Sequence, residues 1–211
     1  MPYSQGPPVQ GRGLAHRDLA INSTGGVLFH GGSLFSSVEL QAMRMDGLMA
    51  HVCGESYVRT DQPSTPAIRA QSAINTVPRS LHARVALARQ SAAWVYGCAP
   101  APAVVSLVTD HRRRTTALPA FCDAVMHQVT LGPCDLSTIG GVPVTSPLRT
   151  ALDVAIHGQD FWAVETLKSI AAAPGLRCPL HLVILSLESS VRVPGKARAL
   201  SRLREALRVS R

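Results

Sequence analysis

The sequence predicts an α+β protein in which a small helix-plus-hairpin unit precedes a small mixed sheet and a helical C-terminal third. Three observations support this fold class. Short extended runs recur between residues 84 and 145, apolar residues recur at helical spacing after residue 146, and Gly or Pro separates the runs. At 211 residues and 46% hydrophobic composition, the chain is long enough to bury a substantial core.

Residues 1–32 are expected to form a flexible N-terminal arm. They are rich in Gly, Pro, Ser and Gln and show no sustained periodicity, although the stretch GGVLFHGG has room for one short ordered element.

A helix over residues 36–46 and a hairpin over residues 48–59 are expected next. Ser36 or Ser37 can cap the helix, and Glu39 suits its first turn. Two extended runs around Gly54 and Glu55 then indicate a hairpin. The helix side chains expected to face inward are Leu40, Met43 and Met45.

The middle of the chain predicts a small, partly antiparallel sheet. After the linker TDQPSTP, a helix over residues 66–76 should start at Pro66. A buried strand over residues 84–88 should lead into a helix that ends at Gly97, and two further strands are expected over residues 103–110 and 123–131. The polar segment HRRRTTALPAF between those last two strands is either a solvated hairpin loop or a phosphate contact.

The segment GGVPVTSPLRTALDVA, residues 140–155, contains the clearest helix start in the chain. Two glycines form a turn, VPVT is extended, Ser146 can act as N-cap, and Pro147 suits the first helical position because it needs no donor there. The apolar stripe of this helix, which includes Leu148 and Leu152, should lie on the sheet. Arg149 and Asp153 should form a surface pair on the polar flank.

No nucleophile and base coincide in this segment, so it is interpreted as scaffold and not as an active site. Helices over 147–157, 160–172, 179–189 and 196–209 are expected to fill the last third, separated by Gly158, Pro174-Gly175 and Pro194-Gly195.

Positive charge is concentrated at the C-terminus. The formal net charge is +8, and residues 191–211 carry seven Lys or Arg against one acid, whereas residues 1–62 carry four Arg against five acids. This distribution indicates an acidic partner for the last helix. The helix is expected to turn Ala197, Leu200, Leu203 and Leu207 toward the domain. A basic but non-binding amphipathic surface helix is the alternative.

Several function classes lack support in the sequence. The five cysteines are scattered without a C-x-x-C pair, which supports neither a disulfide framework nor a zinc site. Phosphate-binding glycine motifs are absent, and His127 and Ser91 have no identifiable catalytic partners. No long apolar run or signal peptide occurs. We therefore expect a cytoplasmic, non-enzymatic protein with no cofactor, no metal and no membrane contact.

Three segments in order, RVALARQSAAWVYGCAPAP, VVSLVTDHRRR and VMHQVTLGPCDLSTIGGVPVTSPLRTALDVA, resemble the AbiEi-type antitoxins of type IV toxin-antitoxin systems, in particular actinobacterial members. The resemblance covers residues 33–208. It implies a winged-helix-like DNA-binding module, or its remnant, over residues 33–62, followed by an α/β antitoxin domain over 63–211 that ends in a basic helix.

The resemblance further implies a non-enzymatic antitoxin and transcriptional autoregulator. Its expected partners are operator DNA, a cognate nucleotidyltransferase-like toxin and a second copy in a homodimer. The alternative is a protein-interaction domain with a degenerate DNA module that binds an acidic partner through its basic C-terminal helix. Arg44 and Arg59 fall at helix and wing positions. The full set of arginines expected to bind nucleic acid is Arg44, Arg59, Arg112, Arg113, Arg114, Arg198, Arg202, Arg204 and Arg208.

Overall fold

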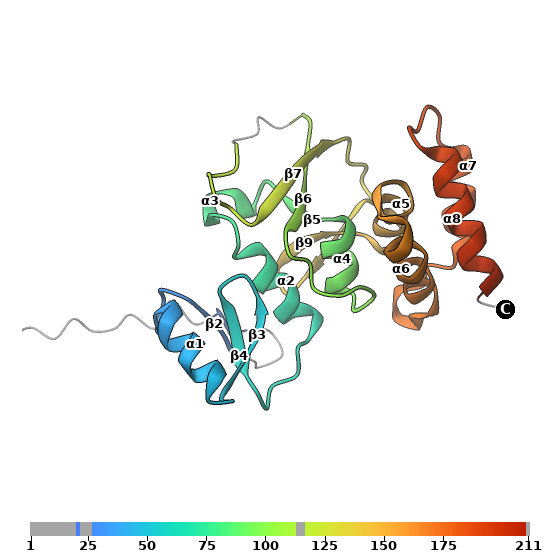
Figure 1. Ribbon diagram of the computed structural model, residues 1–211. Helices are drawn as coiled ribbons and strands as arrows, with labels where there is room; N and C mark the ends of the chain where they lie inside the picture. Colours follow the sequence, from blue (N-terminus) through green and yellow to red (C-terminus); the bar gives the residue numbers. More distant parts are fainter. Residues whose placement is uncertain (1–19, 22–26, 113–116, 210–211) are drawn as a thin grey trace, which may run out of the picture.

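The computed structural model describes residues 20–21, 27–112 and 117–209, which form two sheets and a helical layer (Figure 1). The four-stranded sheet has the order β1-β2-β4-β3, and the five-stranded sheet has the order β7-β6-β5-β9-β8. Helix α2 (Pro66–Ile74) contacts strands of both sheets. Helix α4 (Arg89–Val95) contacts the second sheet on one side and the helical layer on the other.

The N-terminal sheet is antiparallel throughout. The expected helix and hairpin are present as α1 and as β3 with β4. Strand β2 falls inside the expected arm and pairs with β4, so the ordered unit begins before residue 33. Residues 1–19 and 22–26 of that arm lie outside the described residues. The elements are β1 (Ala20–Ile21), β2 (Val27–His30), α1 (Ser37–Met45), β3 (Met49–Cys53) and β4 (Ser56–Arg59).

Helix α1 begins with a capping box. Ser36 Oγ accepts a hydrogen bond from the Glu39 N–H at 3.2 Å, and the Glu39 carboxylate accepts one from the Ser36 N–H at 2.8 Å. Leu40 is fully buried against the sheet, but Met45 is 84% exposed. The prediction that Met45 faces inward is wrong because five residues rotate a helix by roughly 140° beyond a full turn, which places Met45 nearly opposite Leu40.

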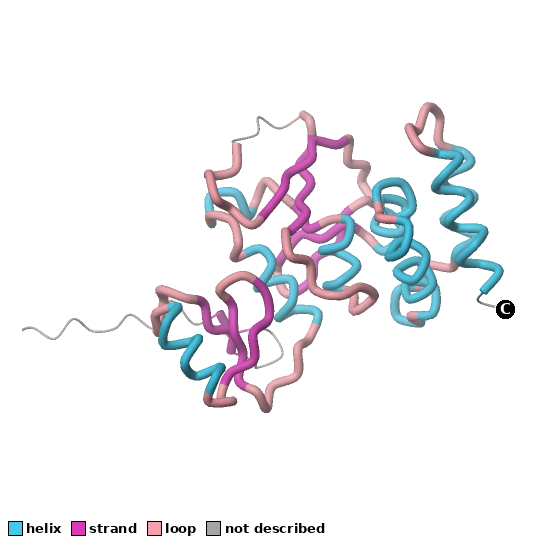
Figure 2. Tube along the Cα trace, viewed as in Figure 1, coloured by secondary structure: helices cyan, strands magenta, loops and turns pink. Residues whose placement is uncertain are grey.

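The second sheet is mixed, as predicted. Strand β5 pairs antiparallel with β6 and parallel with β9, and β8 pairs antiparallel with β9. The prediction of a hairpin loop between β6 and β7 is wrong, because the two strands, drawn as neighbouring magenta segments in Figure 2, are parallel. Parallel pairing requires a crossover connection of about a dozen residues or more, and the segment between Asp110 and Ala124 is long enough for one. The strands are β5 (Ala86–Leu87), β6 (Val105–Asp110), β7 (Ala124–Val129), β8 (Leu136–Ile139) and β9 (Val142–Thr145).

The helices of the last third agree with their predicted bounds to within one residue. Helix α4 also ends as predicted, with Gly97 at φ +82° and the Cys98 N–H donating to Ala93 O at 2.8 Å in a Schellman motif. The short α3 (Arg79–His82) was not predicted. The remaining elements are α5 (Pro147–His157), α6 (Asp160–Ala172), the 3-10 turn η1 (Pro174–Leu176), α7 (Leu180–Ser189) and α8 (Lys196–Val209).

One hydrophobic core joins the two sheets. Leu28 and Val58 of the N-terminal sheet belong to the same buried cluster as Ile68 of α2 and Leu87 and Val144 of the second sheet. Residues on both sides of position 62 therefore share a core.

A second core lies among the helices, where α5 contacts α4, α6, α7 and α8. The prediction that α5 lies on the sheet is wrong because α4 occupies that place, and the apolar stripe of α5 is covered by helices instead. Figure 1 shows α4 between the sheet and α5.

Candidate functional site

The start of α5 is built from short-range polar contacts. Ser146 Oγ accepts a hydrogen bond from the Arg149 N–H at 3.4 Å, and Pro147 occupies the first helical position. The hydroxyl groups of Thr145 and Thr150, both fully buried, lie 2.7 Å apart. The two threonine hydroxyls thus form a hydrogen bond with each other, and Ser146 binds a backbone N–H at the start of the helix. These contacts agree with the scaffold interpretation of this segment.

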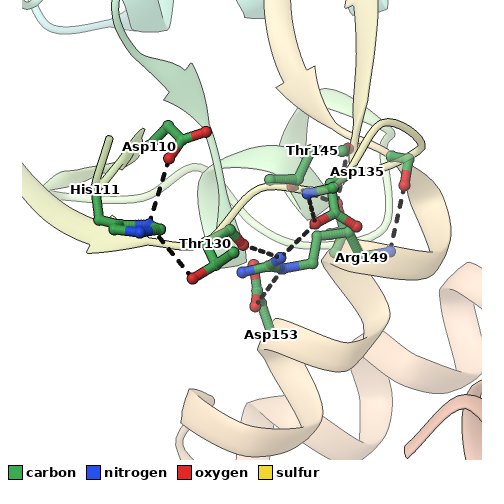
Figure 3. Close-up of polar contacts among 10 residues, drawn as sticks. Asp110, His111, Thr130, Asp135, Thr145, Arg149 and Asp153 are labelled. Carbon is green, nitrogen blue, oxygen red and sulfur yellow. Dashed lines mark hydrogen bonds and ion pairs between the residues drawn. The ribbon is translucent and has the colours of Figure 1, made fainter. Parts of the chain in front are cut away.

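Arg149 is the centre of a largely buried ion-pair network. Its Nε donates to Asp153 Oδ1 at 3.0 Å, and its Nη1 donates to Asp135 Oδ2 at 2.7 Å and to Thr130 O at 3.2 Å (Figure 3). The side chains of Arg149 and Asp153 are 17% and 9% exposed. The predicted pair of Arg149 and Asp153 is therefore present, but the prediction that it lies on the surface is wrong, because the loop between β7 and β8 covers this flank of α5.

Asp153 is held in an environment that penalises its charge. Burial raises the pKa of the Asp153 carboxyl, and the adjacent Arg149 guanidinium offsets this only in part. Its second oxygen, Oδ2, has no hydrogen-bond partner among the described residues. Asp153 therefore depends on Arg149 to remain in place.

The positively charged Arg89 lies next to this network and acts on two histidines. Burial lowers the pKa of both His127 and His157, and the charge of Arg89 lowers both further. Arg89 has φ +53°, a left-handed conformation that is uncommon for a non-glycine residue. The same arginine lies within the electrostatic reach of Asp153 and Arg149.

A cavity of about 180 Å³ opens beside Arg89, at the junction of α4, α5, α6 and β6. His157 lines it from the end of α5, Trp162 from the first turn of α6, and Ser106 from β6. The described residues that line it include no carboxylate. Sequence reasoning missed Arg89 and His157; the signal available was an arginine placed directly between a buried strand and a helix.

The arginines predicted to bind nucleic acid do not form one cluster. Arg44 is exposed on α1. Arg59 is exposed on β4 and forms an ion pair with Asp61 at 2.6 Å. Arg112 is exposed at the start of the crossover connection, and Arg113 and Arg114 lie outside the described residues.

The inward face of α8 agrees only in part with the predicted one. Leu203 is fully buried and Leu200 packs against the helical core, as predicted. Ala197 and Leu207 are exposed, and Ala199 and Ala206 are fully buried in their place. Arg202 is only 5% exposed; its Nη1 donates to Ala155 O at 2.7 Å and its Nε to Asp160 Oδ1 at 2.8 Å. The prediction of Arg202 as a surface residue is wrong, because this ion pair joins α8 to the beginning of α6.

Arg198, Arg204 and Arg208 remain exposed on α8. Arg198 donates to Ile156 O at 3.3 Å, and Arg204 lies 3.6 Å from the Glu188 carboxylate. The exposed face of α8 thus carries fewer arginines than the sequence predicts, because Arg202 is buried.

The described part of the chain contains no group of three or more His, Cys, Asp or Glu side chains that could hold a metal ion. The five cysteines carry free thiols. Within the described ranges no single helix is long and apolar enough to cross a membrane; α6 together with η1 and α7 passes by length and composition, but as a pair bent by 79°.

Comparisons with known proteins find a family match for the C-terminal part of the chain. The model of the AbiEi antitoxin C-terminal domain matches residues 84–208, which include the five-stranded sheet and the helical layer. No curated protein matches the chain. Among solved structures, the crystal structure of the RV2827C protein from Mycobacterium tuberculosis is similar, with 16% identity and a TM-score of 0.43. The match covers 82% of this chain and 64% of that one, so this chain spans less than two thirds of its length.

Proposed function

We propose that this chain, which belongs to the AbiEi antitoxin family through its C-terminal domain, is the antitoxin of a type IV toxin-antitoxin system and counteracts a nucleotidyltransferase-like toxin. The observation that carries this proposal is the family match over residues 84–208. That range corresponds to one continuous unit, from β5 to the last turn of α8. We further propose that the protein acts in the cytoplasm without catalysis of its own, since the polar groups of its most distinctive segment serve as scaffold.

Co-expression with the neighbouring toxin gene tests the antitoxin role. Growth should recover when the full chain is induced together with the toxin, and should not recover with a chain that carries Val144→Asp in the core between the sheets. Failure of the intact, folded chain to restore growth would remove the proposal. A purified toxin that shows no nucleotidyl transfer would argue against the proposed toxin class.

Autoregulation through operator DNA is the second part of the proposal. An exposed helix, α1, directly precedes the hairpin of β3 and β4, and Arg44 is exposed near the end of that helix. Exposed Arg198, Arg204 and Arg208 add positive charge on α8. Such cations would contact phosphate groups and make the affinity depend on salt. A homodimer would match a palindromic operator.

A mobility-shift assay on the upstream region of the operon, at two salt concentrations, tests operator binding. Arg44→Gln should weaken retardation, and Lys168→Gln on α6 is the matched loss of a charge elsewhere. Sedimentation of the free protein and of its DNA complex reports whether two copies bind together.

The alternative function is a protein-interaction domain that binds an acidic partner through α8. One observation favours it: in the N-terminal unit, Val38, Met45 and Leu48 are exposed apolar side chains, and Arg59 is already paired with Asp61. Exposed apolar residues are more typical of protein contacts than of phosphate contacts. Retardation no stronger than for random DNA would select this alternative.

A further inference from the structure

We propose that the cavity at the junction of α4, α5, α6 and β6 binds a nucleoside phosphate, with the phosphate beside Arg89 and His157 and the base against Trp162. This inference goes beyond the antitoxin role and does not depend on it. The ligand has two sources, a free nucleotide or the phosphorylated end of a nucleic-acid strand, and these share the same chemistry.

Arg89 supplies the first argument. Arg89 lines the cavity, and its guanidinium is partly withdrawn from water, so that burial lowers its pKa. It forms no hydrogen bond or ion pair with any residue in the part of the chain that the structure describes. A half-buried guanidinium without a partner is costly, and a phosphate would supply the bidentate acceptor that suits its geometry.

The backbone of Arg89 gives the second argument. Its φ of +53° is a conformation in which glycine is favoured and a long side chain is strained. The chain nevertheless has arginine there, directly after the buried Ala88, which follows β5 and is the N-cap residue of α4. Strain of this kind concentrates at functional sites, where it fixes the direction of a side chain.

The charges around the cavity favour an anion. The described lining residues include Arg89 and His157 but no carboxylate. The acid whose charge acts on Arg89 is Asp153, and its carboxylate is already bonded to Arg149. Arg149 and Arg198 act on His157 from α5 and α8, and Arg89 acts on it from α4. An incoming phosphate would therefore relieve mutual repulsion among these cations.

Trp162 identifies the ligand as more than a bare anion. Its side chain is 46% exposed at the cavity, and the adjacent Phe161 is 77% exposed, with the two rings 5.3 Å apart in an edge-to-face arrangement. Exposed aromatic rings beside a basic pocket are the usual platform on which nucleobases stack. A cavity of about 180 Å³ is too small to enclose a whole nucleotide, so the phosphate would enter and the base would remain at the rim.

Equilibrium dialysis of the full chain against AMP tests the proposal. The intact protein should bind AMP in the micromolar to millimolar range, at least tenfold more tightly than inorganic phosphate. Arg89→Gln should weaken AMP binding at least tenfold, whereas Arg79→Gln, which removes an exposed arginine of α3 that does not line the cavity, should leave it within twofold. Trp162→Leu should reduce the preference for AMP over inorganic phosphate.

Arg89→Gly controls for folding, because glycine suits the positive φ at this position and the variant should be at least as resistant to heat as the intact protein. It should still lose AMP binding. A dinucleotide with a 5′-phosphate and the same dinucleotide without it distinguish a strand end from a free nucleotide as the source. The proposal is overturned if neither AMP nor the phosphorylated dinucleotide binds, if inorganic phosphate binds as well as AMP, or if folded Arg89→Gly retains full affinity.

Discussion

Arg149 and Asp153 form an ion pair of 3.0 Å, one turn apart on α5, in a part of the protein where both side chains are largely hidden from water. The same guanidinium reaches Asp135 at 2.7 Å, so it joins the helical layer to the connection between β7 and β8. A pair that would be worth a few tenths of a kcal/mol on an exposed helix becomes a structural joint when a loop covers it.

Replacement of Arg149 should destabilise the protein strongly. Arg149→Met leaves the buried Asp153 carboxylate without its partner, and we expect a loss of about 3 kcal/mol in the free energy of unfolding, measured by urea titration. The exposed pair of Arg59 and Asp61 is the control, and Arg59→Met should cost at most about 1 kcal/mol. Adding Asp153→Asn to Arg149→Met should restore part of the loss. Equal costs at the two arginines would contradict the buried-network interpretation.

Arg202 should behave as a structural residue and not as a DNA contact. Arg202→Met removes the donors to Ala155 O and Asp160, and should lower the free energy of unfolding by about 2 kcal/mol. Arg204→Met, on the exposed side of the same helix, should change it by at most about 0.5 kcal/mol. If Arg202→Met were as stable as the intact protein while losing DNA retention, the assignment of this residue to the fold would have to be abandoned.

The stability of the protein should fall as the pH drops below about neutral, in part through His157. Burial, followed by the charges of Arg89, Arg149 and Arg198, lowers the pKa of His157 from 6.5. Between the folded pKa and 6.5 the unfolded chain therefore binds more protons, so the free energy of unfolding decreases as the pH falls through this window.

Urea titrations at pH 7.5 and pH 5.5 measure this effect. His157→Gln should show a smaller loss of stability between the two pH values than the intact protein. Gln159→Ala, which changes a cavity-lining residue without a titratable group, is the matched control and should leave the pH difference unchanged. A His157→Gln protein with the same pH dependence as the intact chain would exclude this histidine as a source.

The Gly140-Gly141 turn should tolerate alanine unequally. Both residues have positive φ, +56° and +79°, but a Cβ at Gly140 would lie 2.9 Å from Ala67 Cβ and 3.0 Å from Ala67 Cα, whereas a Cβ at Gly141 meets nothing within 4 Å. We expect Gly141→Ala to cost about 1 kcal/mol from conformation alone, and Gly140→Ala about 1–2 kcal/mol more. Thermal unfolding of the two variants measures the difference. Similar midpoints would mean that α2 shifts at Ala67 to make room for the added methyl group.

Local chemistry determined the helices of this protein. The Ser36 and Glu39 capping box, the Ser146-Pro147 start of α5 and the glycine that ends α4 each act within a few residues of the backbone groups they satisfy. The sequence therefore predicts the helical bounds closely. It also predicts most of the strands, because alternation of polar and apolar residues is a property of neighbouring positions, but it does not predict the short β1 or β8.

Only the tertiary structure decided which strands pair, which arginines are hidden and where a site could form. A strand pattern carries no direction, so the parallel pairing of β6 with β7 could not be predicted from either run. Arg202 is buried because α6 begins beside α8, and Arg89 approaches His157 because α4 packs between the sheet and α5. Charge, burial and partners depend on residues that are distant in sequence, and the free energy of a charged side chain is set by those neighbours and not by its own segment.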